Sequence, residues 1–255
     1  MYFLNYQEEI ELFNERNQAA LALFPLLNEA LDNTFKKISP SGRNQKIVYA
    51  LGRLSARHFE AIMLLCMNGL GFSAMRILRS MFEKIVDGGF INNNQSVVHD
   101  FVEYYFLQLK KTGFENFAKK VDPDFLETIE KFKNPTSKRY RMSWSTDDVV
   151  SRAKACGFSD FFIDYAYRIP NEFVHSSFGE IVLSFRTEAD GTTTACEHDN
   201  PNERRMADVC YQLACHLLVQ TIILQIAAFE LPAEPLLEEY QEKIEQHFVS
   251  LISTH

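Results

Sequence analysis

Residues that form turns are scarce in this chain, and this scarcity restricts its fold more than any other feature. There are 10 Gly and 8 Pro among 255 residues, both below the usual shares of ~7% and ~5%. Sandwiches, barrels and propellers need a turn roughly every 8–12 residues, so many-stranded β folds are excluded. Because 46% of the residues are hydrophobic, the composition is globular rather than disordered. We therefore expect few turns and long helices.

The spacing of apolar residues predicts a series of helices. They cover residues 6–37, 44–68, 73–92, 97–111, 124–132, 145–155, 158–167, 202–230 and 236–252. Gly69 and Gly71 place a tight turn between two of them, which must then pack as antiparallel neighbours. Asp190-Gly191 lies between runs rich in Thr and Val and predicts one small β-hairpin near residues 181–197. The predicted fold is an all-α antiparallel helical bundle.

Three local features refine these elements. Ser145 and Asp148 match a capping box that begins the helix over 145–155, and Gly157 ends it. Pro170 either interrupts a helix or is the first residue of a new one. In the helix over 97–111, the residues expected to face inward are Phe101, Tyr104, Tyr105 and Leu109.

The chain has no repeat or linker and is expected to form one domain over residues 1–255. Its core bundle covers about 44–230, with the helices over 6–37 and 236–252 packed on it. The most apolar stretch, Leu213 to Leu231, contains His216 and two Gln, which favours a core helix over a membrane span. We expect Cys66, Cys210 and Cys215 to be buried as small hydrophobic residues. With no CxxC pair and no secretory signal, the sequence predicts a cytoplasmic protein.

The charge is acidic overall but unevenly distributed. A net charge of −8 does not favour wrapping around nucleic acid. Two segments, 36–57 and 131–141, nevertheless carry basic residues and no acidic ones. Either they bind a phosphate-bearing partner, or they are solvated faces that pair with acids elsewhere. The candidate nucleic-acid contacts are Arg53, Arg57, Lys138, Arg139 and Arg141.

A polar strip lies on the otherwise apolar helix over 73–92. Arg79 and Glu83 are four residues apart and share one face, with Ser80 beside them. A charge in such surroundings needs a partner, because burying it alone costs several kcal/mol. The pair either holds the helix packing or belongs to a functional site.

A second polar cluster follows Tyr167. It contains Arg168, Asn171, His175 and Ser176, and Asn171 and His175 share one helical face. A His titrates near neutral pH and can move a proton, while an Arg can hold a phosphate, and phosphodiester cleavage needs both abilities. The plain alternative is that His175 caps a helix. The motifs of nucleotide-binding loops, zinc proteases and serine hydrolases are missing, and we expect no metal or cofactor.

These residues carry a resemblance. Arg168-x6-His175, with Asn171 inside, resembles the R-x(4–6)-H motif of the all-helical HEPN superfamily. The stretch from Leu51 to Ser177 also resembles a bacterial family of unknown function, in four segments. They are the helix over 61–65, the turn over 69–71, Arg79-Ser80-x-x-Glu83, and Tyr167 with Val174-His175-Ser176-Ser177.

The resemblance implies a helical bundle that dimerises. HEPN ribonucleases join the motifs of two chains in one cleft and cut RNA without metal, using the ribose 2′-OH as nucleophile. In such a site His175 would take or give the proton and Arg168 would stabilise the charge on phosphorus. Asn171 would orient the phosphate or His175, and Arg79 or Glu83 would support the motif's Arg.

Three hypotheses therefore stand. The first is a metal-independent endoribonuclease, acting as a toxin or phage-defence effector, with RNA as substrate, a homodimer as the working unit and an antitoxin or other protein as partner. The second is a non-catalytic interaction or sensory module, in which Arg79, Glu83 and His175 form a structural polar network. The third is a small-ligand or nucleotide-binding bundle without hydrolysis. None of them involves a membrane.

Overall fold

The computed structural model describes residues 7–174, 178–187, 190–196, 200–234, 237–238, 240 and 243. The long helices are α1 (Gln7–Arg16), α2 (Gln18–Lys37), α3 (Arg43–Met67), α4 (Gly71–Asn93), α5 (Val98–Lys111) and α12 (Pro201–Ala228). The short ones are η1 (Gln95–Val97), α6 (Glu115–Val121), α7 (Phe125–Glu130), α8 (Val149–Ala155), α9 (Asp160–Ile163), the π-helical η2 (Asp164–Arg168), α10 (Ile169–Val174) and α11 (Phe178–Leu183). Strands β1 (Phe185–Thr187) and β2 (Thr193–Ala195) pair antiparallel. The prediction of an all-α bundle with one small hairpin is confirmed.

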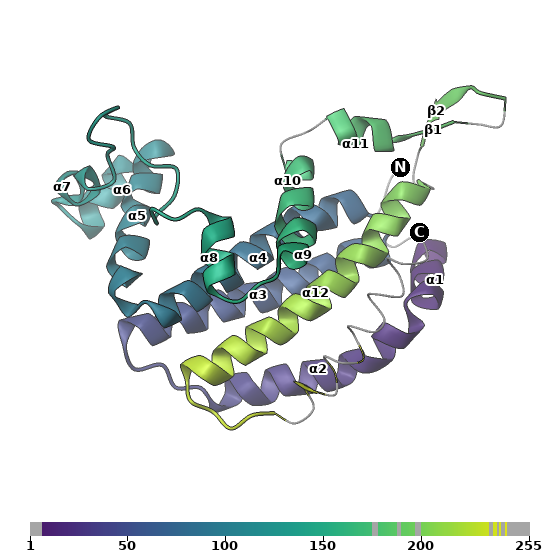
Figure 1. Ribbon diagram of the computed structural model, residues 1–255, viewed down its shortest axis with the longest axis horizontal. Helices are drawn as coiled ribbons and strands as arrows, with labels where there is room; N and C mark the ends of the chain where they lie inside the picture. The colour runs from purple at the N-terminus through teal and green to yellow at the C-terminus, as the bar shows by residue number, and fades with distance from the viewer. Residues whose placement is uncertain are drawn as a thin grey trace.

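Three long helices form the centre of the bundle. α3 and α4 pack as the predicted antiparallel hairpin, and α12 lies against both of them (Figure 1). Among the described helices, α12 alone is long and apolar enough to cross a membrane, with a mean hydropathy of 1.6 over 18 residues. Because 72% of that window is buried inside the protein, α12 serves as a core helix, as its internal polar residues predict. Cys66, Cys210 and Cys215 are fully buried around it.

The turn between α3 and α4 depends on two glycines. Gly69 has a φ of +71°, a left-handed conformation that favours glycine. Gly71 begins α4 directly on the backbone of α12. A Cβ at Gly71 would lie 2.2 Å from the Glu203 carbonyl oxygen and 2.4 Å from the Ala207 nitrogen. The close contact of α4 with α12 therefore requires a residue without a side chain.

The helices α5, α6 and α7 form a lobe at one end of the bundle, away from the β-hairpin (Figure 1). Its own apolar cluster includes Leu107, Phe125, Ile129 and Phe132, and Trp144 joins it from the following loop. Segments α8 to α10 lie over α4 between this lobe and the other end. In Figure 1, α5 stands at the lobe end of α4, and α8 lies between α5 and α9.

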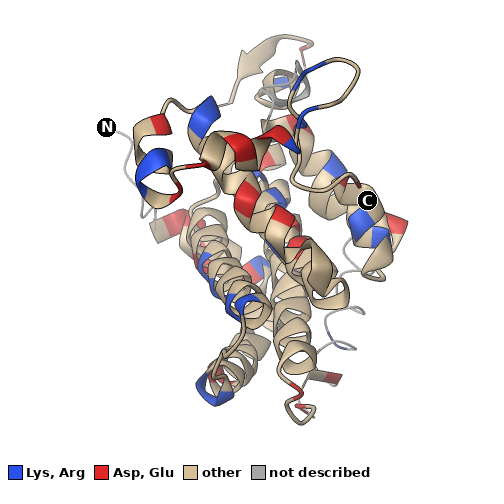
Figure 2. Cartoon of the chain, turned by 90° about the vertical axis from the view of Figure 1, so that its left-hand side faces the viewer, with Lys and Arg blue, Asp and Glu red and all other residues tan. Residues whose placement is uncertain are grey.

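Charged residues are mixed on the surface of the lobe. Viewed from that side, Lys and Arg are interspersed with Asp and Glu rather than gathered on one face (Figure 2). Lys131 contacts both Asp100 and Glu103, and Lys133 contacts Glu130. The basic run over 131–141 is thus partly neutralised by acids from other segments.

Several predicted helix boundaries are wrong. The helix expected over 6–37 is divided into α1 and α2 at Asn17, whose side-chain amide donates to the Phe13 carbonyl and to Asp208. α6 was not predicted. Tyr105, expected to face inward, has 51% of its surface exposed.

The prediction of a capping box at Ser145 is also wrong. Helix α8 begins at Val149, because Asp148 itself is the N-cap and its Oδ1 accepts from the Ser151 amide at 2.7 Å.

At Pro170 the chain stays helical, with Pro170 as the second residue of α10. The wide π turn of η2 comes immediately before it, where a proline cannot donate the usual amide hydrogen bond.

Two further predictions were tested in part. The hairpin strands are shorter than predicted, and Ile181 to Leu183 belong to α11 instead. The helix expected over 236–252 lies mostly outside the described residues. Within it, Leu237 and Tyr240 are described and buried.

Candidate functional site

A cleft of about 870 Å³ opens over α4. α4 forms its floor, α5 one wall, and the segment from Met142 to α8 the other. The residues that line it are Arg79, Glu83, Lys84, Asp87, Phe101, Val102, Tyr104, Tyr105, Gln108, Met142, Ser143, Trp144, Asp148, Val149, Arg152 and Tyr167. The lining therefore combines charged groups on the floor with aromatic rings on the walls.

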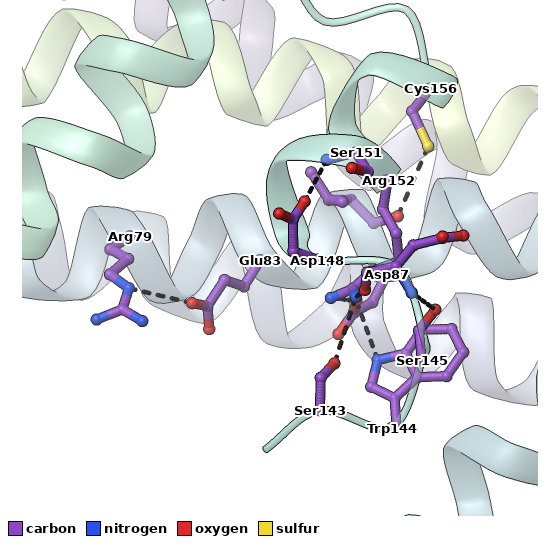
Figure 3. Close-up of polar contacts among 12 residues, drawn as sticks. Arg79, Glu83, Asp87, Ser143, Trp144, Ser145, Asp148, Ser151, Arg152 and Cys156 are labelled. Carbon is purple, nitrogen blue, oxygen red and sulfur yellow. Dashed lines mark hydrogen bonds and ion pairs between the residues drawn. The ribbon is translucent and has the colours of Figure 1, made fainter. Parts of the chain in front are cut away.

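The predicted pair of Arg79 and Glu83 lies on the floor of this cleft. Arg79 Nε donates to Glu83 Oε1 at 3.1 Å (Figure 3), and both side chains are partly buried. The Arg79 guanidinium also lies 5.2 Å from the centre of the Tyr167 ring, a cation–π contact. The structure thus brings together two polar features that are far apart in the sequence.

One turn further along α4, Asp87 forms a second ion pair. Arg152 Nη2 lies 3.0 Å from Asp87 Oδ1, and Trp144 Nε1 donates to the same oxygen at 3.2 Å (Figure 3). The Arg152 guanidinium lies 5.1 Å from the centre of the Trp144 ring. Burial raises the pKa of Asp87, and the charge of Arg152 and the Trp144 hydrogen bond only partly oppose this. This network fixes α8 and the loop before it on α4.

Sequence reasoning missed Asp87, Trp144 and Arg152. A signal was present, because Arg79, Glu83 and Asp87 follow one another at four-residue steps on one helix face. Trp144, the single Trp of the chain, stands in a segment without helical periodicity. Its partner could not be identified before the packing of α8 on α4 was known.

Lys84 differs from the two arginines of the cleft. Within the described part of the chain it has no carboxylate at ion-pair distance, whereas Arg79 and Arg152 each have one. Its charge is nonetheless effective, because burial and Lys84 together lower the pKa of His58 on α3. Lys84 also opposes the raised pKa of Asp87, so it supplies a positive charge at the floor of the cleft without forming an ion pair among the described residues.

The predicted catalytic group is only partly described. Arg168 Nη1 donates to Asp164 Oδ1 at 2.6 Å, with both side chains about half exposed, and it does not line the cleft. Asn171 is partly buried on α10, one turn after Tyr167, and Ser80 is partly buried beside Arg79 on α4. His175 and Ser176 lie outside the described residues, so the proximity of Arg168 and His175 stays a prediction.

The five candidate nucleic-acid contacts lie outside the cleft. On α3, Arg53 lies 5.2 Å from the centre of the Phe35 ring, and Arg57 is exposed one turn later. Lys138 and Arg139 are exposed in a turn closed by a bridge between residues 133 and 140. Arg141 packs its guanidinium over the Phe132 ring. The described structure thus separates the two basic segments from the residues that line the cleft.

A metal site is not seen in the part of the chain that is described. No group of three or more His, Cys, Asp or Glu side chains gathers there in a position to hold an ion. The three carboxylates of the cleft are instead paired: Glu83 with Arg79, Asp87 with Arg152, and Asp148 with the backbone amide of Ser151.

The fold and the cleft define an all-α protein with a charged floor flanked by aromatic walls. Residues 45–192 match DUF5677, a family of unknown function. Because this match covers more than half of the chain, the protein belongs to that family. The matched region contains every residue that lines the cleft. No curated protein and no solved structure shows significant similarity to the chain.

Proposed function

We propose that the protein is a HEPN-like endoribonuclease that cleaves RNA without a metal ion. The supporting observation is the contact of Arg79 with Glu83 and Tyr167 at the edge of a large cleft. Asn171 and His175 follow Tyr167 at steps of four residues, which favours one helical face. A phosphate-binding cation would then lie near a proton-transfer group.

The chemistry assigned to this site is internal transesterification. The ribose 2′-oxygen attacks the neighbouring phosphorus, the bond to the 5′-oxygen breaks, and a cyclic phosphate and a free 5′-hydroxyl result. His175 takes the proton from the 2′-hydroxyl or gives one to the leaving oxygen. A cation stabilises the charge on phosphorus, a role typically worth ~2.7–4 kcal/mol.

The structure changes which arginine is favoured for that role. Arg168, the arginine of the motif, is exposed and held by Asp164. Arg79 is more buried, contacts Tyr167 and faces the cleft. We therefore assign phosphate stabilisation to Arg79, with Glu83 orienting it, and keep Arg168 and Asn171 as supporting groups. The working unit is a cytoplasmic homodimer, acting as a toxin or phage-defence effector under the control of a protein partner.

The test is degradation of total RNA by the purified protein in EDTA. The wild-type protein and the Arg168→Ala variant should cut RNA, whereas His175→Ala and Arg79→Ala should be at least about a hundredfold slower. Equal degradation by the wild type and His175→Ala, or none by the wild type, contradicts the proposal.

The alternative, a non-catalytic interaction or sensory module, is favoured by one observation. Arg79 and Glu83 satisfy each other in a partly buried pair, as a structural network requires. In that case His175→Ala should lower the free energy of unfolding by ~1–3 kcal/mol, the cost of a lost buried hydrogen bond. An unchanged melting temperature counts against this alternative.

A further inference from the structure

The half of the cleft beyond Arg79 has features that the proposed cleavage step does not use. We propose that it binds one nucleotide of single-stranded RNA, with the base stacked on Tyr105 and a phosphate at Lys84. The choice of RNA as the source of this nucleotide rests on the proposed function. The ligand chemistry itself, a planar ring joined to an anion, rests on the residues of the cleft.

Tyr105 supplies the stacking surface. It is 51% exposed, whereas its neighbour Tyr104 is 6% exposed and donates its hydroxyl to the Arg141 carbonyl. Phe101, Tyr105 and Gln108 follow one face of α5 and line the same wall. An aromatic ring left half exposed in a cleft offers a face on which any base can stack.

Lys84 supplies the charge. The other two cations of the cleft are paired, Arg79 with Glu83 on the floor and Arg152 of the α8 wall with Asp87. Lys84 is the cation of the described lining that has no ion-pair partner. One ammonium group without an ion pair matches one phosphate, which it would attract as a point charge.

The size and lining of the cleft narrow the ligand class. Its 870 Å³ lie within the range of ~300–1,000 Å³ typical of small-molecule sites. An apolar ligand would leave the Lys84 charge without a partner, and a bare anion would leave the aromatic wall uncovered. A nucleotide uses both features at once.

The test measures binding separately from cleavage. A short, fully 2′-O-methylated oligoribonucleotide has no free 2′-hydroxyl, so it reports binding alone, by fluorescence anisotropy. Lys84→Met and Tyr105→Ala should each weaken its binding about tenfold, which equals ~1.4 kcal/mol. Tyr105→Phe keeps the ring and Lys84→Arg keeps the charge, so both should bind within about twofold of the wild type.

Matched controls lie outside the cleft. Lys120 is an exposed lysine and Phe114 an exposed aromatic residue, 61% accessible, both near or on α6. Lys120→Met and Phe114→Ala should leave binding unchanged. If they weaken it as much as the cleft variants do, binding is not located in the cleft and the proposal is overturned.

Three other results also overturn it. They are no binding of the oligonucleotide by the wild type, equal binding by Lys84→Met and Tyr105→Ala, and binding of a mononucleotide or inorganic phosphate without binding of the oligonucleotide. Any of these can occur while the protein still cleaves ordinary RNA, so the two proposals fail separately. Conversely, oligonucleotide binding that depends on Lys84 and Tyr105 supports the site even if His175→Ala has no effect on RNA.

Discussion

Replacing Arg152 by Met tests whether the buried ion pair holds α8 against α4. The Arg152 side chain is 3% exposed and that of Asp87 is 13% exposed. Removing one partner of a buried pair costs ~3–5 kcal/mol, because the other charge stays buried without compensation. Asp87 keeps its hydrogen bond from Trp144, so we expect the lower end, ~3 kcal/mol. For a chain of this size that corresponds to a melting temperature roughly 6–12 °C lower.

The pH dependence of this loss identifies its cause. Burial already raises the pKa of Asp87 above its ordinary value of 3.8, and loss of Arg152 should raise it further. A raised folded-state pKa means that stability is fully present below the unfolded pKa and is lost as pH rises through the folded one. The difference between the wild type and Arg152→Met should therefore be small near pH 4 and reach its full size at neutral pH. Chemical denaturation at several pH values measures it.

Arg168→Met is the matched control. Arg168 also pairs with an Asp, but both side chains are about half exposed, so its loss should cost ~0–1 kcal/mol. Adding Asp87→Asn to Arg152→Met removes the uncompensated charge and should restore part of the stability. A loss below about 1 kcal/mol for Arg152→Met, or one of equal size at pH 4 and pH 8, would refute the reasoning.

Three further predictions concern the core. Gly71→Ala places a methyl group against the backbone of α12 and should lower the free energy of unfolding by ~1–3 kcal/mol, measured by thermal denaturation. An unchanged melting temperature would show that α4 and α12 can move apart without loss of stability. Asn17→Ala removes the amide that donates to Asp208 and should cost ~1–3 kcal/mol; a silent variant would mean that Arg16 alone satisfies this carboxylate. In maleimide labelling, the partly exposed Cys196 should react in the native protein. Burial raises the pKa of Cys215 to about 12, and rapid native labelling would contradict the packing of the fully buried cysteines, Cys66, Cys210 and Cys215.

The local elements were largely predictable, and the exceptions have identifiable reasons. α3, α4, α5 and α12 were predicted to within about two residues, because apolar periodicity is strong in each. The division at Asn17 was missed because its cause is a contact with Asp208 of α12, far away in the sequence. Tyr105 was assigned to the core because its spacing fits the buried face of α5. Spacing alone does not show that Tyr105 borders a cleft, which leaves about half of its surface exposed.

For the candidate site, the sequence located Arg79 and Glu83 but missed Asp87, Trp144 and Arg152. Arg79 and Glu83 were paired correctly from their four-residue spacing, since one helix suffices to bring them together. Arg168 was matched with His175 by a motif, yet its described partner is Asp164, one turn earlier on the same exposed face. Residue types and spacings were sufficient only where the interaction stays within one helix.

By itself the sequence determined the fold class. Few glycines and prolines leave few turns, and local periodicity locates the long helices α3, α4, α5 and α12. Only the tertiary structure decided which charges form ion pairs. Arg152 of α8 reaches Asp87 of α4, while Lys84, on the same floor, makes no ion pair among the described residues. The physical reason is that ion pairing depends on distances of a few ångströms between side chains. Helices distant in the sequence acquire those distances only when they pack.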